Sequence, residues 1–289
     1  MKKVAFLTLD ERGDYVIDDE HAIKPLADLG WRVSTVSWRQ TAVPWKNFDA
    51  VLIRSTWDYW NDISGFLDTL SHIDQQTAMA NPLPLVQWNY RKTYLQDLEE
   101  KGVKIVPTLW LGEPGLSHIE SCFELLELDE LVIKPVIGAN GEDAYRISRS
   151  DEPEHLERIV DRFRGRDGMV QPFMPRILSE GEFSLFYFAS EFSHAILKKP
   201  AEREFRSQEE HGAEILAVNP EERLLQRGRQ AIDSIAPEPL YARVDFVRDE
   251  REDFRLMEME LIEPSMYLRM DGGAPQRFAQ AIDSWFSRC

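Results

Sequence analysis

The chain has 289 residues, 43% of them hydrophobic and 29% charged, a composition typical of a globular protein with room for two or three small domains. Its formal net charge of −17 argues against a nucleic acid or an anionic membrane as partner, because both bind basic surfaces. No apolar run reaches the roughly 18 residues that a membrane span needs. The two cysteines, Cys122 and Cys289, indicate neither a disulfide framework nor a metal cluster, so we expect a cytoplasmic location.

The N-terminal part alternates between strand-like and helix-like segments. Apolar runs at 4–9, 32–38 and 49–55 predict strands, and residues 18–29 predict a helix. Such alternation is typical of an open α/β sheet. We therefore expect an N-terminal α/β substrate domain over residues 1–86.

Ligands of open α/β sheets bind beyond the carboxyl ends of the strands, which directs attention to the residues after the third predicted strand. There, Arg54 could hold a carboxylate and Asp58 an ammonium group, an arrangement that would suit an amino acid or a small peptide. Ser55 and Trp57 are further candidates for substrate binding. An alternative of equal weight is that Trp57 and its aromatic neighbours pack an interdomain surface.

The rest of the chain is expected to form two further lobes of mixed α and β structure. Two prolines within residues 81–88 predict a linker, and a helix is expected over 89–102. We expect a small lobe over 87–168 and a C-terminal lobe over 169–289.

The last predicted strand, RLMEMELIE, alternates apolar and acidic residues. Met257, Met259 and Leu261 are expected on one face of the strand, and Glu258 and Glu260 on the other. Glutamate is a poor strand residue, and like charges side by side destabilise a sheet. Two glutamates alone are equally compatible with a solvated strand face and with a binding site.

The preceding predicted strand, YARVDFV, favours the binding site. If the two strands pair, Arg243 and Asp245 lie on the same patch as Glu258 and Glu260. Three carboxylates would then converge, and a hard cation would remove their repulsion. Carboxylate oxygens are ligands that Mg²⁺ prefers, so this pair of strands predicts a magnesium site.

Lysine is rarely buried without a partner, yet Lys134 stands within the apolar run LVIKPVI. Three more cations are Lys92 near the start of a predicted helix, Lys198 at the end of a predicted strand and Arg206 in a predicted loop. Each of them alone is more typical of a surface charge. Together with a magnesium site they suit a nucleoside triphosphate, whose phosphates are bound by lysine, arginine and metal ions.

Two weaker features of the sequence also suit a bound nucleotide. Gly138 and Gly141 follow the Lys134 strand, and glycines let a backbone approach phosphate closely, although two glycines usually just form a turn. Phe173 and Met174 could form the apolar slot for an adenine, with Glu182 near the ribose, although both apolar residues are equally expected in a core. The sequence contains no P-loop motif, which argues against a P-loop nucleotide site. It also lacks the GxGxxG fingerprint, which argues against a dehydrogenase.

The order of these motifs resembles that of the ATP-grasp carboxylate–amine ligases. It runs N-YRK, VIKPVIGANG, VQPFM…GE, FRSQ…GA, RVDFV and MEMELIEPS, and the similarity covers about residues 87–270. The pattern is similar to that of bacterial glutathione synthetase, the RimK-type glutamate ligases and the cyclo-ligase of D-cycloserine formation. The resemblance implies an ATP-grasp fold of class α/β with an N-terminal open α/β domain.

The resemblance also implies a role for each position. It implies two phosphate lysines (Lys92, Lys134), a mobile loop (Gly138 to Gly141), an adenine hinge (Gln171, Pro172, Phe173, Met174), a ribose carboxylate (Glu182), cations near the γ-phosphate (Lys198, Arg206), a metal triad (Asp245, Glu258, Glu260) and a substrate residue (Ser265). Glu260 departs from the pattern, because relatives often have asparagine there.

The implied reaction is the ADP-forming ligation of a carboxylate and an amine. ATP would phosphorylate the carboxylate, with two Mg²⁺ ions (or Mn²⁺) and the lysines neutralising charge, and Arg206 and Arg243 would hold the acyl phosphate. Small-molecule substrates are the expected partners, and a homodimer is common in related proteins. The alternatives are a phosphotransferase on the same fold and a nucleotide-binding protein without turnover.

Overall fold

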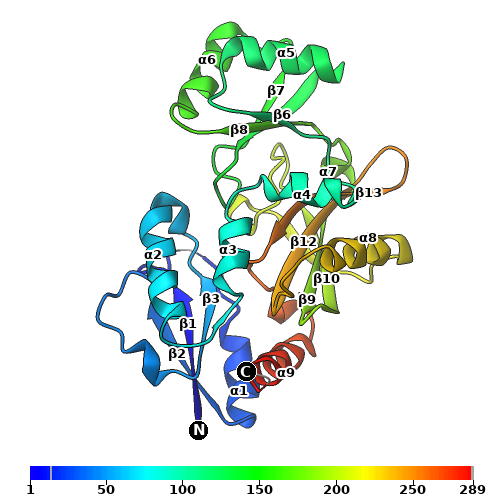
Figure 1. Cartoon of the computed structure of the whole chain (residues 1–289). Helices are drawn as coiled ribbons and strands as arrows, with labels where there is room; N and C mark the ends of the chain where they lie inside the picture. Colours follow the sequence, from blue (N-terminus) through cyan, green and yellow to red (C-terminus); the bar gives the residue numbers. More distant parts are fainter. Residues whose placement is uncertain (14, 288–289) are drawn as a thin grey trace.

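The computed structural model describes residues 1–13 and 15–287, and its N-terminal part is a four-stranded parallel sheet in the order β2-β1-β3-β4 (Figure 1). Helices cover both faces, as a parallel sheet requires. Val4 and Phe6 of β1 pack towards α1 and α9, and Ala5 and Leu7 pack towards α2. The elements are β1 (Lys2–Thr8), α1 (Glu20–Asp28), β2 (Trp31–Ser37), η1 (Trp45–Asn47), β3 (Ala50–Ser55), η2 (Tyr59–Asn61), α2 (Ile63–Asp74), β4 (Met79–Ala80) and α3 (Leu83–Asn89).

The middle of the chain forms an antiparallel sheet in the order β5-β8-β6-β7, with two helices on one face (Figure 1). Leu131 and Ile133 of β6 pack with Ile119 of α5 and Ile159 of α6. Val132 and Lys134, which alternate with these two residues on β6, point to the other face of the sheet. The elements are α4 (Tyr94–Glu100), β5 (Leu109–Leu111), α5 (Leu116–Leu126), β6 (Glu130–Pro135), β7 (Tyr145–Ser148), α6 (Pro153–Arg162) and β8 (Gly168–Pro172).

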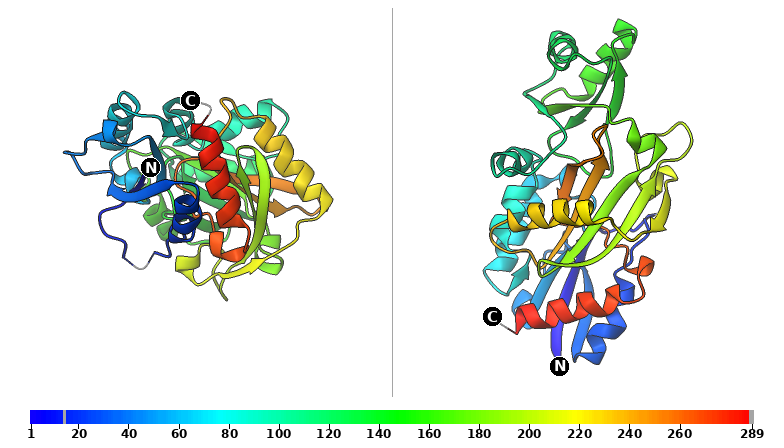
Figure 2. Two further views of the ribbon diagram at one scale, coloured as in Figure 1. Left: turned by 90° about the horizontal axis from the view of Figure 1, so that it is seen from below. Right: turned by 90° about the vertical axis from the view of Figure 1, so that its right-hand side faces the viewer.

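The C-terminal part forms a five-stranded antiparallel sheet in the order β11-β10-β9-β12-β13. Helix α8 packs on one face, and α9 lies between the other face and the N-terminal sheet (Figure 2). The elements are α7 (Arg176–Ser179), β9 (Glu182–Phe188), β10 (Glu191–Lys199), η3 (Glu209–His211), β11 (Glu214–Ala217), α8 (Glu222–Asp233), β12 (Tyr241–Arg248), β13 (Phe254–Glu260), η4 (Leu268–Met270) and α9 (Ala274–Phe286).

The connection between the first two sheets differs from the expectation. Residues 81–88 were expected to be a linker, but most of them belong to helix α3, whose Leu85 and Val86 are buried in two cores. Pro82 precedes the helix and Pro84 lies in its first turn, where proline is tolerated because its missing N–H would have no helical partner. Strand β8 pairs with β5 and β6 in the second sheet, although the boundary expected at 168/169 placed it in the following lobe.

A register shift in the last hairpin changes which residues face the site. Asp245 pairs with Glu258, but the next residue, Phe246, pairs with Leu256, so Met257 is an extra residue on β13. Our expectation that Met257 shares a face with Met259 is therefore wrong. A β-bulge re-aims a side chain, and here it leaves Met257 only partly buried in the cleft, while Met259 is 1% exposed and packs in the core.

A cleft opens between the second and third sheets and reaches the N-terminal domain. It encloses about 1630 Å³ of space outside atoms, its open mouth included. Its lining comes from all three parts of the fold and includes both charged and apolar side chains, as ligand sites usually do. Within the described residues, no helix has both the length and the apolar character needed to cross a membrane.

Candidate active site

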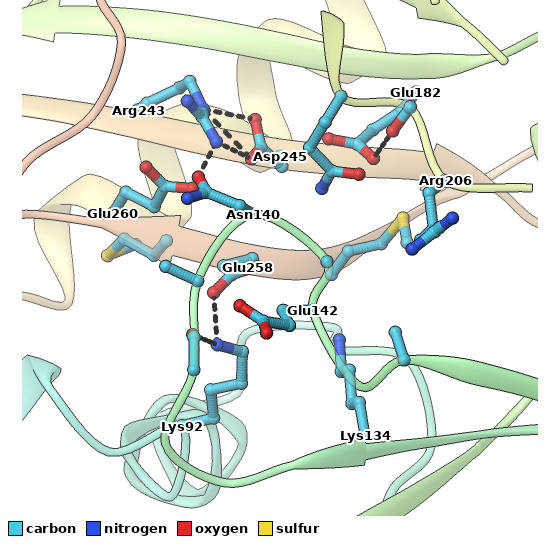
Figure 3. Close-up of a pocket in the computed structure, with 18 of the residues that line it drawn as sticks. Lys92, Lys134, Asn140, Glu142, Glu182, Arg206, Arg243, Asp245, Glu258 and Glu260 are labelled. Carbon is cyan, nitrogen blue, oxygen red and sulfur yellow. Dashed lines mark hydrogen bonds and ion pairs between the residues drawn. The ribbon is translucent and has the colours of Figure 1, made fainter. Parts of the chain in front are cut away.

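Strand β6 explains how Lys134 can stand in an apolar run. Leu131 and Ile133 point into the core beneath α5 and α6, so Val132 and Lys134 point the opposite way, into the cleft. In the described parts of the chain, the Lys134 ammonium group has no hydrogen bond or ion pair, and Figure 3 shows the side chain pointing from its strand towards the middle of the pocket. Burial lowers the pKa of Lys134, although Glu258 opposes that shift. An anionic ligand would supply the missing partner.

Lys92 ties three parts of the cleft together. It lies between α3 and α4, and its Nζ is 2.8 Å from Glu258 Oε1 and donates a 2.6 Å hydrogen bond to the Gly138 carbonyl (Figure 3). The Lys92 backbone N–H also donates to the Val136 carbonyl at 2.9 Å. The structure therefore brings Lys92 and Lys134 into one cleft, from elements that are far apart in the sequence.

Strands β9, β10 and β12 contribute a buried charged group. Lys198 Nζ pairs with Glu182 and lies 3.7 Å from Asp245 Oδ2. Ser184 donates a 2.5 Å hydrogen bond to Asp245 Oδ1, and Ser207 donates to Glu182. Glu182, which was expected at a ribose, thus already accepts bonds from two protein groups.

The two last strands bring the predicted carboxylates side by side. Asp245 pairs with Glu258 across the ladder, and Arg243 pairs with Glu260. The Arg243 guanidinium forms ion pairs with both Asp245, at 3.0 Å, and Glu260 (Figure 3). These groups all line the cleft, as the alternation of the sequence predicted.

These carboxylates have the chemistry of a Mg²⁺ site, although within the described residues no three acidic or imidazole groups form a preassembled cluster. Arg243 holds two of them and Lys92 holds Glu258. Burial, opposed by Arg243 and reinforced by Glu258, raises the pKa of Glu260 to about 7. The three carboxylates supply hard oxygen donors on one patch of the cleft, and such donors fit a divalent cation.

Apolar residues line the other end of the cleft. Phe173 and Met174 pack there with Val106, Ile177 and Met257. The Arg146 guanidinium covers the Phe173 ring at 3.8 Å from its centroid. Gln171 and Pro172, the other hinge candidates, belong to β8 and also line the cleft. The sequence did not indicate Met257, because the bulge that exposes it leaves no mark in the alternation.

Three loops meet over the charged groups. Asn140, in the glycine-rich segment, accepts through its backbone carbonyl from His211 at 3.3 Å, and its amide donates to the Tyr15 hydroxyl at 3.3 Å. Gly141 lies close to Arg206, and its φ of +65° favours glycine. Arg206 is paired with Glu204 at 2.7 Å. This arrangement places the predicted mobile loop and Arg206 at the mouth of the cleft.

The substrate candidates of the N-terminal domain are divided by the structure. Trp57 and Ser265 line the cleft. Arg54, only 2% exposed, pairs with Asp19 at 2.9 Å outside it, and Asp58 pairs with Arg39 at 2.9 Å. The buried Ser55 hydroxyl bonds the Thr8 hydroxyl. Arg54, Ser55 and Asp58 thus have protein partners and are not among the residues that line the cleft, and substrate contact by these three stays a prediction.

Arg54 and Trp57 instead hold the segment 262–265, which enters the cleft after β13. The Arg54 guanidinium donates to the Pro264 carbonyl at 3.0 Å, and the Trp57 indole donates to the Glu263 carbonyl at 2.8 Å. The Tyr241 hydroxyl donates to the Ile262 carbonyl at 3.0 Å. Three successive carbonyls are thus fixed by side chains, and this fixes Glu263, a cleft residue that the sequence analysis did not select.

Known proteins share this sequence and fold. Residues 4–81 match the domain family described as D-cycloserine synthetase DcsG, N-terminal domain. The chain is 30% identical over 272 residues to the cycloserine biosynthesis protein DcsG of Streptomyces lavendulae. The aligned part covers 88% of this chain and 89% of that protein. The crystal structure of D-cycloserine synthetase DcsG superposes with a TM-score of 0.88 at 27% identity, over 98% of this chain and 99% of that chain.

More distant structures share the fold alone. D-alanine–D-alanine ligase from Bacillus anthracis superposes with a TM-score of 0.71 at 12% identity, over 100% of this chain and 98% of that chain. A RimK domain ATP-grasp protein from Sphaerobacter thermophilus superposes with a TM-score of 0.71 at 14% identity, over 97% of this chain and 99% of that chain.

The fold is therefore the ATP-grasp fold, and the resemblance that the motif order predicted is confirmed. An enzyme of this class uses ATP to join a carboxylate to an amine. The chain belongs to the D-cycloserine synthetase family of ATP-grasp ligases.

Proposed function

We propose that this ligase activates the carboxylate of an amino-acid derivative as an acyl phosphate and closes a ring by attack of a nitrogen in the same molecule. The observation that carries the proposal is the cleft itself. It combines the unpaired ammonium group of Lys134, the Lys92–Glu258 pair and the carboxylates of β12 and β13. The ring closure is proposed because the relatives are a cycloserine biosynthesis protein and a D-cycloserine synthetase.

Residues of this chain would hold the nucleotide. Lys134 and Lys92 would bind phosphate oxygens, and the apolar end around Phe173 and Met174 would hold the adenine. Asp245, Glu258 and Glu260 would hold two Mg²⁺ ions, with Mn²⁺ as an alternative. Bound Mg²⁺ supplies charge neutralisation on the transferring phosphoryl group.

The reaction would proceed in two steps, phosphoryl transfer and ring closure. A substrate carboxylate oxygen attacks the γ-phosphorus, the bond to ADP breaks, and an acyl phosphate forms. The nitrogen then attacks the carbonyl carbon, the C–N bond forms, and the bond to phosphate breaks while the nitrogen loses a proton. Arg243 and Arg206 would bind the acyl phosphate, because paired N–H donors fit its oxygens. The loops of Tyr15, Asn140 and His211 would exclude water that would otherwise hydrolyse it.

The cycloserine ring indicates the class of substrate. Its ring nitrogen is bonded to both the carbonyl carbon and the oxygen of a serine skeleton, so the open-chain acid is a serine whose oxygen carries nitrogen. We place the enzyme in the cytoplasm, where ATP is supplied, and propose a homodimer.

Nucleotide and product analysis tests this function. The enzyme is incubated with Mg-ATP and a panel of amino acids, dipeptides and O-substituted serines in both configurations, and ADP, phosphate and product mass are measured. Ring closure predicts release of ADP and phosphate that depends on one acid, with a product lighter than that acid by one water. A product heavier by a phosphoryl group would make the enzyme a phosphotransferase, and no acid-dependent turnover would contradict the proposal.

A further inference from the structure

One buried carboxyl group in the cleft has no partner among the described residues. Five charged residues that line the cleft are at least nine-tenths buried, and four of these, Glu182, Lys198, Arg243 and Asp245, form ion pairs. The fifth is Glu263, which is 6% exposed. Within the described residues its carboxylate has neither a hydrogen bond nor an ion pair. Burying an unpaired carboxylate is unfavourable, so a ligand is expected to pair with it.

The surroundings of Glu263 favour a cation as that ligand. Glu258 and Glu260 are the other acidic influences on this carboxylate, and the cations near it, Lys92 and Arg243, are already paired with those glutamates. Burial, reinforced by Glu260, raises the pKa of Glu263 well above its usual range, which favours the uncharged acid as long as no further cation lies beside it. A cationic ligand would favour the ionised carboxylate and pair with it.

Tyr59 adds a second acceptor to the cleft that Glu263 lines. The residue is 5% exposed, and its hydroxyl has no hydrogen-bond partner among the described residues. Apart from burial, Glu263 is the strongest cause of the raised pKa of the Tyr59 hydroxyl, so the two groups interact. An ammonium group has three N–H donors, and a carboxylate with a phenol oxygen can accept two or more of them.

We propose that Glu263, with the Tyr59 hydroxyl, binds the α-ammonium group of the amino-acid substrate. This inference rests on the proposed function, because ring closure on a serine skeleton consumes the carboxylate and leaves the α-amino group free. An aliphatic ammonium held by Glu263 stays protonated and cannot attack the acyl phosphate. The nitrogen on the serine oxygen is a far weaker base and stays neutral, so it is the group that attacks. Glu263 would thus select both the substrate class and the reacting nitrogen.

The backbone around Glu263 is held for this task. The Glu263 carbonyl accepts from the Trp57 indole at 2.8 Å and the following carbonyl, of Pro264, accepts from Arg54 at 3.0 Å. The carboxylate is therefore presented from a rigid segment, as precise binding requires. Trp57 and Arg54 act here as positioning residues, and neither contributes a charge to the proposed ammonium site.

The test compares two ligands that differ only in the amino group. Cycloserine and isoxazolidin-3-one, which lacks that group, are titrated by calorimetry into the enzyme with Mg-ADP bound. The proteins are the wild type, Glu263→Gln, Glu263→Asp, Tyr59→Phe and the control Glu214→Gln, which changes an exposed carboxylate outside the cleft. We expect Glu263→Gln to weaken cycloserine binding by about ten- to a hundredfold, the loss of one charge-assisted hydrogen bond. Glu263→Asp should restore part of it, and isoxazolidin-3-one should bind all variants alike.

Two results would overturn the inference. One is equal cycloserine affinity in the wild type and Glu263→Gln. The other is an unchanged cycloserine affinity with a higher Mg²⁺ requirement for Mg-ADP binding, which would assign Glu263 to the metal. The proposed function fails separately, if the wild-type enzyme releases no ADP with any acid of the panel, and the inference then falls with it.

Discussion

Lys92 Nζ lies 2.8 Å from Glu258 Oε1, so the segment between α3 and α4 is tied directly to strand β13. The same ammonium group binds the Gly138 carbonyl and so anchors the start of the glycine-rich segment. One ion pair thus connects the nucleotide side of the cleft to the carboxylates proposed to bind metal.

Removing the charge of Glu258 is expected to weaken metal binding. Glu258→Gln should raise the Mg²⁺ concentration for half-maximal ADP release by tenfold or more, because a carboxylate oxygen ligand becomes a neutral amide. The measurement is a Mg²⁺ titration at saturating ATP. Glu214→Gln, on the exposed side of β11, serves as the matched control and should titrate like the wild type. An unchanged titration in Glu258→Gln would remove this residue from the metal site.

Lys134 is expected to be essential for turnover and dispensable for folding. Lys134→Met keeps most of the length of the side chain and removes a cation that has no hydrogen bond or ion pair within the described residues. We expect ADP release to fall by about a hundredfold or more, the usual effect of removing one electrostatic contact to a transition state. Thermal unfolding should be unchanged or slightly improved, because a desolvated charge is lost. Normal turnover in this variant would contradict the assignment of the cleft.

Arg54 is expected to act through stability and position. Arg54→Met leaves Asp19 without its partner and the Pro264 carbonyl without its donor, so we expect a loss of about 3–5 kcal/mol of unfolding free energy. The measurement is urea unfolding. The control, Lys24→Met, breaks an exposed pair with Asp28 and should change stability by less than about 0.5 kcal/mol. Equal stability of the two variants would show that Arg54 is no structural anchor.

His194 is expected to make the protein less stable in acid. It stacks on Phe186, and burial lowers the pKa of His194 from 6.5 to about 4. Between these two values the unfolded chain binds the proton and the folded one does not, so stability falls as the pH drops through this window. The contribution is about 3 kcal/mol in total. Urea unfolding at several pH values gives the unfolding free energy as a function of pH, and this free energy should change less with pH in His194→Phe than in the wild type. An equal pH dependence of the two proteins would contradict this role of His194.

Periodicity and turn residues predicted much of this fold. The N-terminal open α/β sheet and the shared patch of Asp245 and Glu258 on the last two strands follow from alternation and apolar runs. Helix α3 was missed because prolines usually mark a linker, whereas here they precede the helix or lie in its first turn. The bulge at Met257 was missed because a single inserted residue does not disturb the sequence pattern.

The sequence predicted those residues of the candidate site whose type is unusual in its local context. Lys134 could be found because a lysine within an apolar strand contradicts its own preferences. The ion pair of Arg54 with Asp19 could not be predicted, because an arginine at a strand end has the same sequence pattern whether it binds a ligand or an aspartate of the protein. Glu263 was missed because its position in the cleft depends on hydrogen bonds from Trp57 and Arg54, which are about 200 residues away in the sequence.

Isotope transfer tests the acyl phosphate most directly. The substrate carboxylate is labelled with ¹⁸O, the enzyme turns over with Mg-ATP, and the released phosphate is analysed by mass spectrometry. An acyl phosphate intermediate predicts that one carboxylate oxygen leaves with each phosphate, so one ¹⁸O appears in phosphate for each product formed. Unlabelled phosphate together with a normal yield of product would contradict carboxylate activation and, with it, the account of this cleft.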